Sequence, residues 1–328
     1  MSNTTISSEI LDLQLASRMI FSYAVLVFIA FGTVGNLLNI FVFIRIKVLR
    51  QMPNSVFLLT SFIASLVQIW TTRFSAAFHN LTGVDLLKQS SFYCEIRWLF
   101  GRTGATISMA SICLSSINRF LMTSQNVRYR QVVTMRCARM TVIVMILIFL
   151  IPLIPDIVYY SGPGCTPTGS PYWYRQYTMY FNQIFSNIVP GPVLAIFGIL
   201  TWRNLRSVRV IQRNRLEEQV NRMILAELVM ICITAIPTII GAIYPLVTVS
   251  ITKSQLRVAQ DSLWLNILAI PGITTYCASF YVFYAASSAY RKNVRTALSC
   301  KKHNRIETQD YTQQQNALIP MKTIALRG

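Results

Sequence analysis

Seven long apolar stretches, separated by short polar segments, dominate the pattern of hydrophobic and polar positions along the chain. They cover residues 19–44, 55–78, 92–118, 140–160, 178–202, 223–249 and 262–286. Each stretch provides the roughly 20 apolar residues that a helix needs to cross a bilayer. The apolar residues run continuously and do not alternate with a period of two, which favours helices over the strands of a barrel. The pattern predicts an all-α integral membrane protein, a bundle of seven transmembrane helices.

The residues after the seventh stretch have a different character. Tyr290, Val294 and Leu298 recur at four-residue spacing, with basic residues between them. This pattern is typical of a short amphipathic helix that lies on the membrane surface. We therefore expect an extracellular N-terminal segment at 1–17, a seven-helix domain at 18–286, a surface helix at 287–299 and a disordered cytoplasmic tail at 300–328.

Prolines mark the expected ends and bends of the spans. Pro53 suits the first turn of the second span, where its missing N–H is not needed. Pro152 and Pro155 lie close together and should break the end of the fourth span.

The composition agrees with a polytopic membrane protein. Hydrophobic residues make up 53% of the 328 residues and charged residues only 12%, with a mean hydropathy of +0.47. Soluble domains carry roughly 25% charged residues. The low charge content over so long a chain therefore excludes an ordinary soluble protein.

The net charge of +19 would suit a nucleic-acid-binding protein, but its distribution excludes that class. In a seven-span arrangement, 22 of the 30 lysines and arginines fall on one side of the membrane. The positive-inside rule makes that side cytoplasmic, with the N-terminus outside and the C-terminus inside. No cleavable signal peptide is expected, so the first span would act as its own insertion signal. The predicted location is the plasma membrane.

Covalent modifications are expected on both sides. Cys94 and Cys165 are the only cysteines on the outer side, where disulfides persist, so we expect them to pair; two unpaired thiols are the alternative. Asn3 and Asn80 begin N-glycosylation acceptor tripeptides on the same side. Cys300, directly after the surface helix, is a position for palmitoylation.

The order and spacing of several residues resemble the rhodopsin-like (class A) family of G protein-coupled receptors. Cys94 and Arg119 are 25 residues apart, the family's distance between its disulfide cysteine and the arginine of its Asp/Glu-Arg-Tyr motif. Gly35-Asn36 is similar to the helix 1 signature, and Pro237 to the helix 6 proline. The resemblance covers nearly the whole chain and points to divergent invertebrate neuropeptide (FMRFamide-like) or orphan receptors.

The resemblance implies that Arg119 contacts a heterotrimeric G protein. It also implies that Glu217, which lies 20 residues before the helix 6 proline, pairs with Arg119 at rest. The alternative for Arg119 is that it only extends toward the membrane interface. The neighbours depart from the family motif, because Asn118 replaces the acid and Phe120 follows. What holds Arg119 at rest is therefore open.

The family's later motifs are also altered. The tryptophan of the helix 6 motif is absent, and the helix 7 Asn-Pro-x-x-Tyr motif reads Ser279-Phe280-Tyr281-Val282-Phe283. Phe283 therefore stands where the family has its tyrosine. These departures put the details of activation in question.

Polar residues inside the spans are candidates for contacts between helices. Asn36 needs a partner within the bundle. Ser65, Ser108 and Ser279 are expected to line the cavity where relatives bind sodium, but Ser65 stands where the family has an aspartate, so we expect no sodium site. Glu227 is the only clear ionisable residue inside a span. It is either protonated or a partner of the motif arginine.

The ligand is expected to enter from outside, among the third, fifth, sixth and seventh spans. Gly101 stands where aminergic receptors have an aspartate, and the seventh span has no lysine for a retinal Schiff base, so neither a monoamine nor retinal is expected. Charged and aromatic residues near the outer mouth suit a peptide better than a lipid. The expected contacts are Arg97, Gly101, Arg102, Asp156, Trp173, Tyr244 and Trp264, for each of which a plain interface anchor is the alternative.

The leading interpretation is a receptor that transmits an extracellular signal, first of all a neuropeptide, to a heterotrimeric G protein. The alternatives are a chemosensory receptor for small molecules and a membrane transporter. Enzyme activity is not expected, because His79 and His303 lie on opposite sides and no catalytic cluster forms. No cofactor or metal is expected. The expected partners are the ligand, the G protein and membrane lipid, and not nucleic acid.

Overall fold

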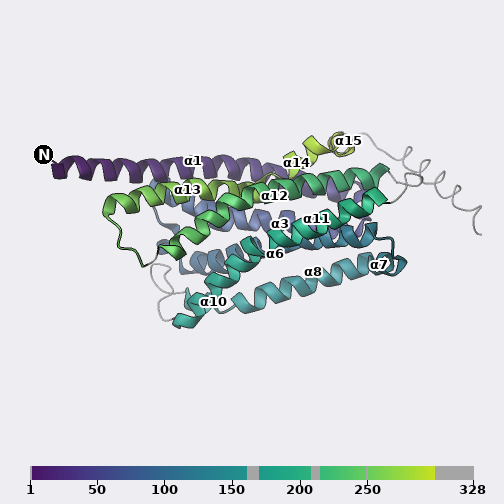
Figure 1. The fold of residues 1–328 in the computed structure, drawn as a ribbon, viewed down its shortest axis with the longest axis horizontal. Helices are drawn as coiled ribbons and strands as arrows, with labels where there is room; N and C mark the ends of the chain where they lie inside the picture. The colour runs from purple at the N-terminus through teal and green to yellow at the C-terminus, as the bar shows by residue number, and fades with distance from the viewer. Residues whose placement is uncertain (1, 161–169, 208–214, 249, 300–328) are drawn as a thin grey trace, which may run out of the picture.

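The computed structural model describes residues 2–160, 170–207, 215–248 and 250–299, which contain no strand. The long helices lie side by side in one elongated bundle (Figure 1). Six helical segments are long and apolar enough to cross a membrane: Ser8–Arg45, Pro53–Thr82, Phe92–Thr123, Met135–Tyr159, Tyr172–Asn204 and Leu225–Pro245. A seventh is formed by α13 (Gln255–Cys277) and α14 (Ser279–Ala286), which are bent by 64°. The prediction of an all-α bundle of seven spans is confirmed.

Several spans are built from more than one helical element. The first three are α1 (Ser2–Arg45), α3 (Pro53–Gln68) with η1 (Ile69–Phe74) and α4 (Ser75–Thr82), and α6 (Ser91–Thr123). The next three are α8 (Met135–Leu150) with η2 (Ile151–Leu153) and α9 (Asp156–Tyr159), α10 (Tyr172–Gln183) with η3 (Ile184–Ile188) and α11 (Pro190–Ser207), and α12 (Arg215–Val247). The short helices are α2 (Lys47–Arg50), α5 (Leu86–Gln89), α7 (Val127–Val132) and α15 (Ser288–Leu298).

The prolines act where the sequence places them. Pro53 is the first residue of α3. The chain leaves the α-helix after Leu150 and forms the 3₁₀ turn η2, which contains Pro152, before α9 begins behind Pro155. The missing N–H of each proline removes one helical hydrogen bond and explains the break.

The first helix begins earlier than the apolar pattern predicts. α1 starts at Ser2 and passes the expected boundary between residues 17 and 18 without interruption. Ser17 is only 1% exposed and accepts a hydrogen bond from Asn266 Nδ2 on α13 at 2.8 Å. Packing against α13 therefore supports the helix beyond the apolar run.

The two ends of the bundle differ in charge. The N-terminus and the start of α10 lie toward one end, here called the α10 end, while α7 and α15 lie at the other, the α15 end (Figure 1). Basic residues of these two short helices gather at the α15 end: Arg128, Arg130, Arg291, Lys292 and Arg295.

An aromatic cluster closes the core at the α15 end. The Phe62 ring lies 5.6 Å from Phe43 and 6.2 Å from Phe283, and the Phe283 ring lies 5.8 Å from Tyr290. The Tyr290 hydroxyl donates to Asn39 Oδ1, and burial raises the pKa of this phenol. The cluster joins the first, second and seventh spans to α15.

The surface helix predicted at 287–299 corresponds to α15. Tyr290, Val294 and Ala297 are buried against the bundle, whereas Leu298 is 56% exposed. Ala297 thus replaces Leu298 in the stripe that docks on the bundle.

Candidate functional site

Two cavities adjoin inside the bundle. The deep cavity, about 210 Å³, touches α6 at Met109 and is otherwise lined by the second, fifth, sixth and seventh spans. The shallow cavity, about 310 Å³, touches α6 between Arg97 and Ala105 and lies nearer the α10 end. Arg73, Asn182 and Gln183 line both cavities, so these residues form the junction between them.

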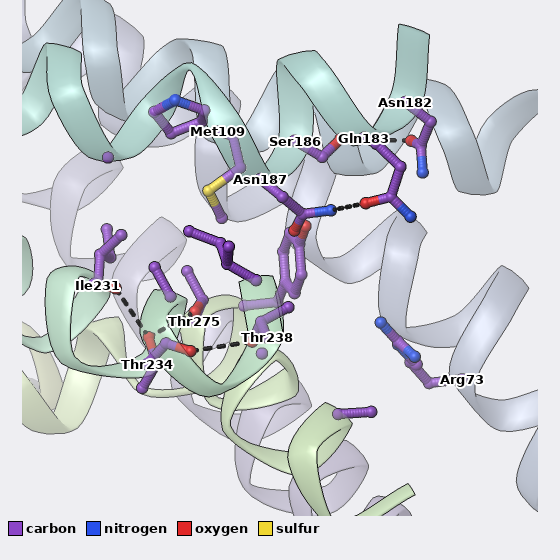
Figure 2. A pocket seen from close by; sticks show the side chains of 17 residues that line it. Arg73, Met109, Asn182, Gln183, Ser186, Asn187, Ile231, Thr234, Thr238 and Thr275 are labelled. Carbon is purple, nitrogen blue, oxygen red and sulfur yellow. Dashed lines mark hydrogen bonds between the residues drawn. The ribbon is translucent and has the colours of Figure 1, made fainter. Parts of the chain in front are cut away.

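Polar side chains from three spans surround the deep cavity (Figure 2). Asn187 Nδ2 donates to Gln183 Oε1 at 2.7 Å within the fifth span. Thr234 of α12 shares a 3.1 Å hydrogen bond with Thr275 of α13. The first bond fixes side chains within the fifth span, and the second links the sixth span to the seventh.

The sequence analysis missed Arg73, which belongs to the π-helical segment η1. Figure 2 shows its guanidinium projecting into the deep cavity, on the side faced by the amides of Asn182 and Gln183. Glu227 is therefore not the only ionisable residue inside a span. The sequence feature that could have identified Arg73 is its position within an apolar run, because an arginine inside a span is a functional candidate by itself.

Arg97 and Arg102 line the shallow cavity, as their proposed role requires. The Arg97 guanidinium lies 5.3 Å from the Trp98 ring and close enough to Arg73 and Asp85 to interact with both electrostatically. The Arg102 guanidinium lies over the same Trp98 ring at 4.5 Å and over the Tyr160 ring at 5.3 Å.

The Asp156 carboxylate forms an ion pair with the Arg102 guanidinium. Arg102 Nη1 lies 3.2 Å from both carboxylate oxygens of Asp156, whose side chain is fully buried. Tyr174 Oη donates to the same carboxylate at 3.1 Å, and Arg102 Nη2 donates to Tyr160 Oη at 3.0 Å. Asp156 lines neither cavity and its carboxylate is bound to Arg102 and Tyr174, so its contact with the ligand stays a prediction.

Gly101 also lines the shallow cavity, and its small size serves helix packing. A Cβ atom there would lie 2.3 Å from Thr72 Oγ1 of η1. Glycine thus allows α6 and the second span to approach closely.

The other expected ligand contacts lie elsewhere. Trp173 is 66% exposed, packs edge-on against Tyr174 and lines neither cavity. Tyr244 and Trp264 line a third space of about 190 Å³ between α12 and α13. There Asp261 accepts from Tyr244 at 2.8 Å and from Lys253 at 2.6 Å, which raises the pKa of Lys253.

Glu227 connects the sixth span to the bend of the seventh. It is 1% exposed, and its Oε1 accepts a 2.5 Å hydrogen bond from the Ser279 hydroxyl at the start of α14. The two other serines expected with Ser279 lie in a separate group, where the Ser65 and Ser108 hydroxyls are 2.8 Å apart. The structure therefore pairs Ser279 with an acid and not with Ser65 and Ser108.

Asn36 crosses from the first span to the same bend. Its Nδ2 donates to the carbonyl of Tyr276 at 2.9 Å and to that of Gly32 at 2.9 Å. Tyr276 lies directly before the break at Ala278, where the helical hydrogen-bond pattern is interrupted. Asn36 therefore satisfies a carbonyl beside the break.

The Glu227–Ser279 bond gives a stability prediction. Ser279→Ala should cost about 1–3 kcal/mol, because it removes the hydrogen-bond donor to a buried carboxyl group. Glu227→Gln should cost less, because the amide oxygen can still accept from Ser279. The thermal midpoint of the purified protein measures both. In a Glu227→Leu background, Ser279→Ala should have almost no further effect; an unchanged cost would show that the bond is not its source.

Arg119 lies at the α15 end of α6 and is only 4% exposed. Beside it, Asn118 Nδ2 approaches Asn54 Oδ1 at 3.5 Å, and Ser115 Oγ donates to the same atom at 3.0 Å. The Phe120 ring packs 5.6 Å from Phe197 of α11. The side chain of Glu217 lies outside the part of the chain that the structure describes.

The predicted modification sites are partly visible. Cys94 is fully buried, and its Sγ lies 2.9 Å from the carbonyl oxygen of Tyr160. Cys165, Cys300 and the side chain of Asn3 lie outside the described residues. Asn80 lies in the last turn of α4.

Comparison with known protein families identifies the family of the chain. The family model described as 7 transmembrane receptor (rhodopsin family) matches residues 35–308, well over half of the chain. No curated protein matches the chain.

Proposed function

The chain belongs to the rhodopsin family of seven-transmembrane receptors, and on this basis we propose that binding of a peptide at the α10 end activates a heterotrimeric G protein at the α15 end. The family consists of non-enzymatic, multi-pass receptors of the plasma membrane, which take an extracellular ligand and a G protein as partners. Three statements are proposals: that the ligand is a peptide, that the α10 end faces outward, and that the residues named below take part.

The proposed sidedness places the α10 end outside the cell and the α15 end in the cytoplasm. The basic residues of α7 and α15 support it, since lysine and arginine are enriched in cytoplasmic segments. A disulfide between Cys94 and Cys165, which stays a prediction, requires the same orientation.

The pair of adjoining cavities is the observation that carries the proposed ligand site. The shallow cavity lies toward the end of α6 opposite to Arg119, the deep cavity lies at the middle of α6, and α6 lines both. Arginine, amide, hydroxyl and aromatic groups around them match the groups that a peptide presents. Because the cavities share three lining residues, a short extended ligand could occupy both.

Arg119 supports the proposed G protein contact only in a second conformation. At 4% exposure it is covered, so a G protein can reach it only after neighbouring helices move. We assign the covered state to the resting receptor. Outward movement of α12 is the proposed activating step.

Loss of the Glu217 charge should raise signalling without ligand. Glu217→Gln is expected to increase basal nucleotide exchange severalfold, because the resting partner proposed for Arg119 is lost. The matched control is Glu218→Gln, which removes the next acid along the helix, about 100° away around its axis. Nucleotide exchange on Gα in membranes measures both, and equal basal rates for the two variants would contradict the proposed pairing.

A direct test of the function uses the full chain in lipid nanodiscs with a panel of purified G proteins. Pooled peptides and pooled small molecules are added separately, and nucleotide exchange on Gα is followed. The proposal expects acceleration by a peptide pool. Acceleration by small molecules alone would favour a chemosensory receptor, and solute uptake without any exchange would favour a transporter.

A further inference from the structure

We propose that the ligand places a carboxylate against Arg73, at the junction of the deep and shallow cavities. This inference rests on the proposed function, because it specifies the ligand of the same site. It differs from the sequence-based expectation of an FMRFamide-like ligand, whose C-terminus would be a neutral amide.

The first observation is that Arg73 carries an uncompensated charge within the described part of the chain. There it makes no hydrogen bond or ion pair, and its Nε is buried without an acceptor. A charged group inside a span is strongly unfavourable unless something pairs with it. An anion bound at the junction would supply that partner.

The second observation is the charge of the lining. Arg73, Arg97 and Arg102 line the two cavities, and none of the lining residues is an aspartate or glutamate. Behind the lining, Asp156 neutralises Arg102, and Asp85 acts on Arg97. Arg73 is therefore the lining cation that lacks an acidic neighbour, although the Nε of Arg97 is likewise buried without an acceptor.

The third observation is that three neutral amides at the site already use their oxygen atoms as acceptors. Gln68 Oε1 accepts from Thr72 at 3.1 Å, Asn182 Oδ1 from Ser186 at 3.3 Å and Gln183 Oε1 from Asn187 at 2.7 Å. Each of these oxygens thus already has a donor, whereas the NH₂ groups of the same amides can only donate.

Together these groups present donors and positive charge to the cavities. Figure 2 shows the amide nitrogens of Asn182 and Gln183 on the side toward Arg73. A carboxylate only accepts hydrogen bonds, and it matches the planar guanidinium with two parallel bonds. A C-terminal amide has no charge to compensate Arg73, and it would add two further donors to a lining that contains no carboxylate.

The test measures the thermal midpoint of the full chain in nanodiscs, at constant ionic strength, with matched probes. Benzoate is compared with benzamide, and the dipeptide Tyr-Phe as a free acid with its C-terminal amide, each at about 10 mM because a single charged contact gives a millimolar Kd. We expect the acids to raise the midpoint by a few degrees and the amides to leave it unchanged. A larger rise with the dipeptide acid would indicate a peptide, and an equal rise a small organic acid.

Two variants make the test specific. Arg73→Gln should remove the rise caused by the acids, whereas Arg203→Gln, which removes an exposed guanidinium from α11, should keep it. Without any probe, Arg73→Gln should itself raise the midpoint, since it removes an uncompensated charge.

The proposal is overturned if neither acid raises the midpoint, if the amides raise it equally, or if Arg73→Gln retains the full rise. Because this measurement needs no G protein, it stays separate from the test of the proposed function. If the chain binds the acids through Arg73 but never stimulates nucleotide exchange, the anion site is supported and the proposed receptor function is contradicted.

Discussion

Arg102→Gln is expected to lower the free energy of unfolding by about 3–5 kcal/mol, because it leaves the carboxylate of Asp156 buried without a charged partner. In the native protein Arg102 Nη1 lies 3.2 Å from both carboxylate oxygens, and the Asp156 side chain has no exposed surface. After the substitution, the Tyr174 hydroxyl is the strongest donor left to that group. The expected observation is a fall of several degrees in the thermal midpoint of the purified protein.

Two comparisons separate this effect from the general loss of an arginine. The double variant Arg102→Met with Asp156→Leu should be far more stable than Arg102→Gln, because both charges leave the interior together. Arg257→Gln is the control: its side chain is 59% exposed in its pair with Asp261, and exposed pairs contribute little. Equal losses for Arg102→Gln and Arg257→Gln would contradict the assigned role of Asp156.

Arg119→Gln is expected to weaken binding of the G protein by about 2–5 kcal/mol, roughly thirtyfold or more, because it removes a buried charged donor from the interface. The change is measured as the affinity of the full chain in nanodiscs for a synthetic peptide that copies the C-terminal helix of Gα. The control is Arg203→Gln, an exposed arginine on the neighbouring α11.

The same experiment decides between the two interpretations of Arg119. A residue that only extends toward the membrane interface would make no difference to the peptide's affinity. Strong loss of affinity together with a normal thermal midpoint would instead identify Arg119 as a contact. Arg119 is only 4% exposed, and Glu217→Gln should uncover it more often. The Glu217→Gln variant is therefore expected to bind the Gα peptide more tightly than the wild type does.

Much of the fold could be predicted because a bilayer restricts what a backbone can do. Each span needs a run of apolar residues and satisfied backbone groups, so the apolar pattern fixes the number of spans and their order. The helix start and the helix break caused by prolines were predictable for an equally local reason, because proline lacks a backbone N–H. These prolines are Pro53, Pro152 and Pro155. The start of α1 was not predictable in this way, because Ser17 is held by a partner on α13.

The candidate site was harder to predict, because it depends on how each helix is rotated about its axis. The π-helical segments η1 and η3 shift that rotation, and both contribute residues to the cavities. A regular helical wheel therefore misplaces the residues that follow them. The position of Ser279 depends instead on the bend between α13 and α14, where it bonds Glu227 and not the serine with which the family resemblance groups it.

The hydrogen bond from Asn36 to the carbonyl of Tyr276 has a consequence for the insertion of the chain into the membrane during synthesis. The two residues are 240 positions apart, so α1 enters the membrane long before the ribosome has produced its partner. Until α13 arrives, the Asn36 amide has the carbonyl of Gly32 in its own helix. Nascent chains that stop before α13 therefore lack the second of the two acceptors of this amide. The polar contacts of the first span are therefore complete only once the seventh span has been inserted.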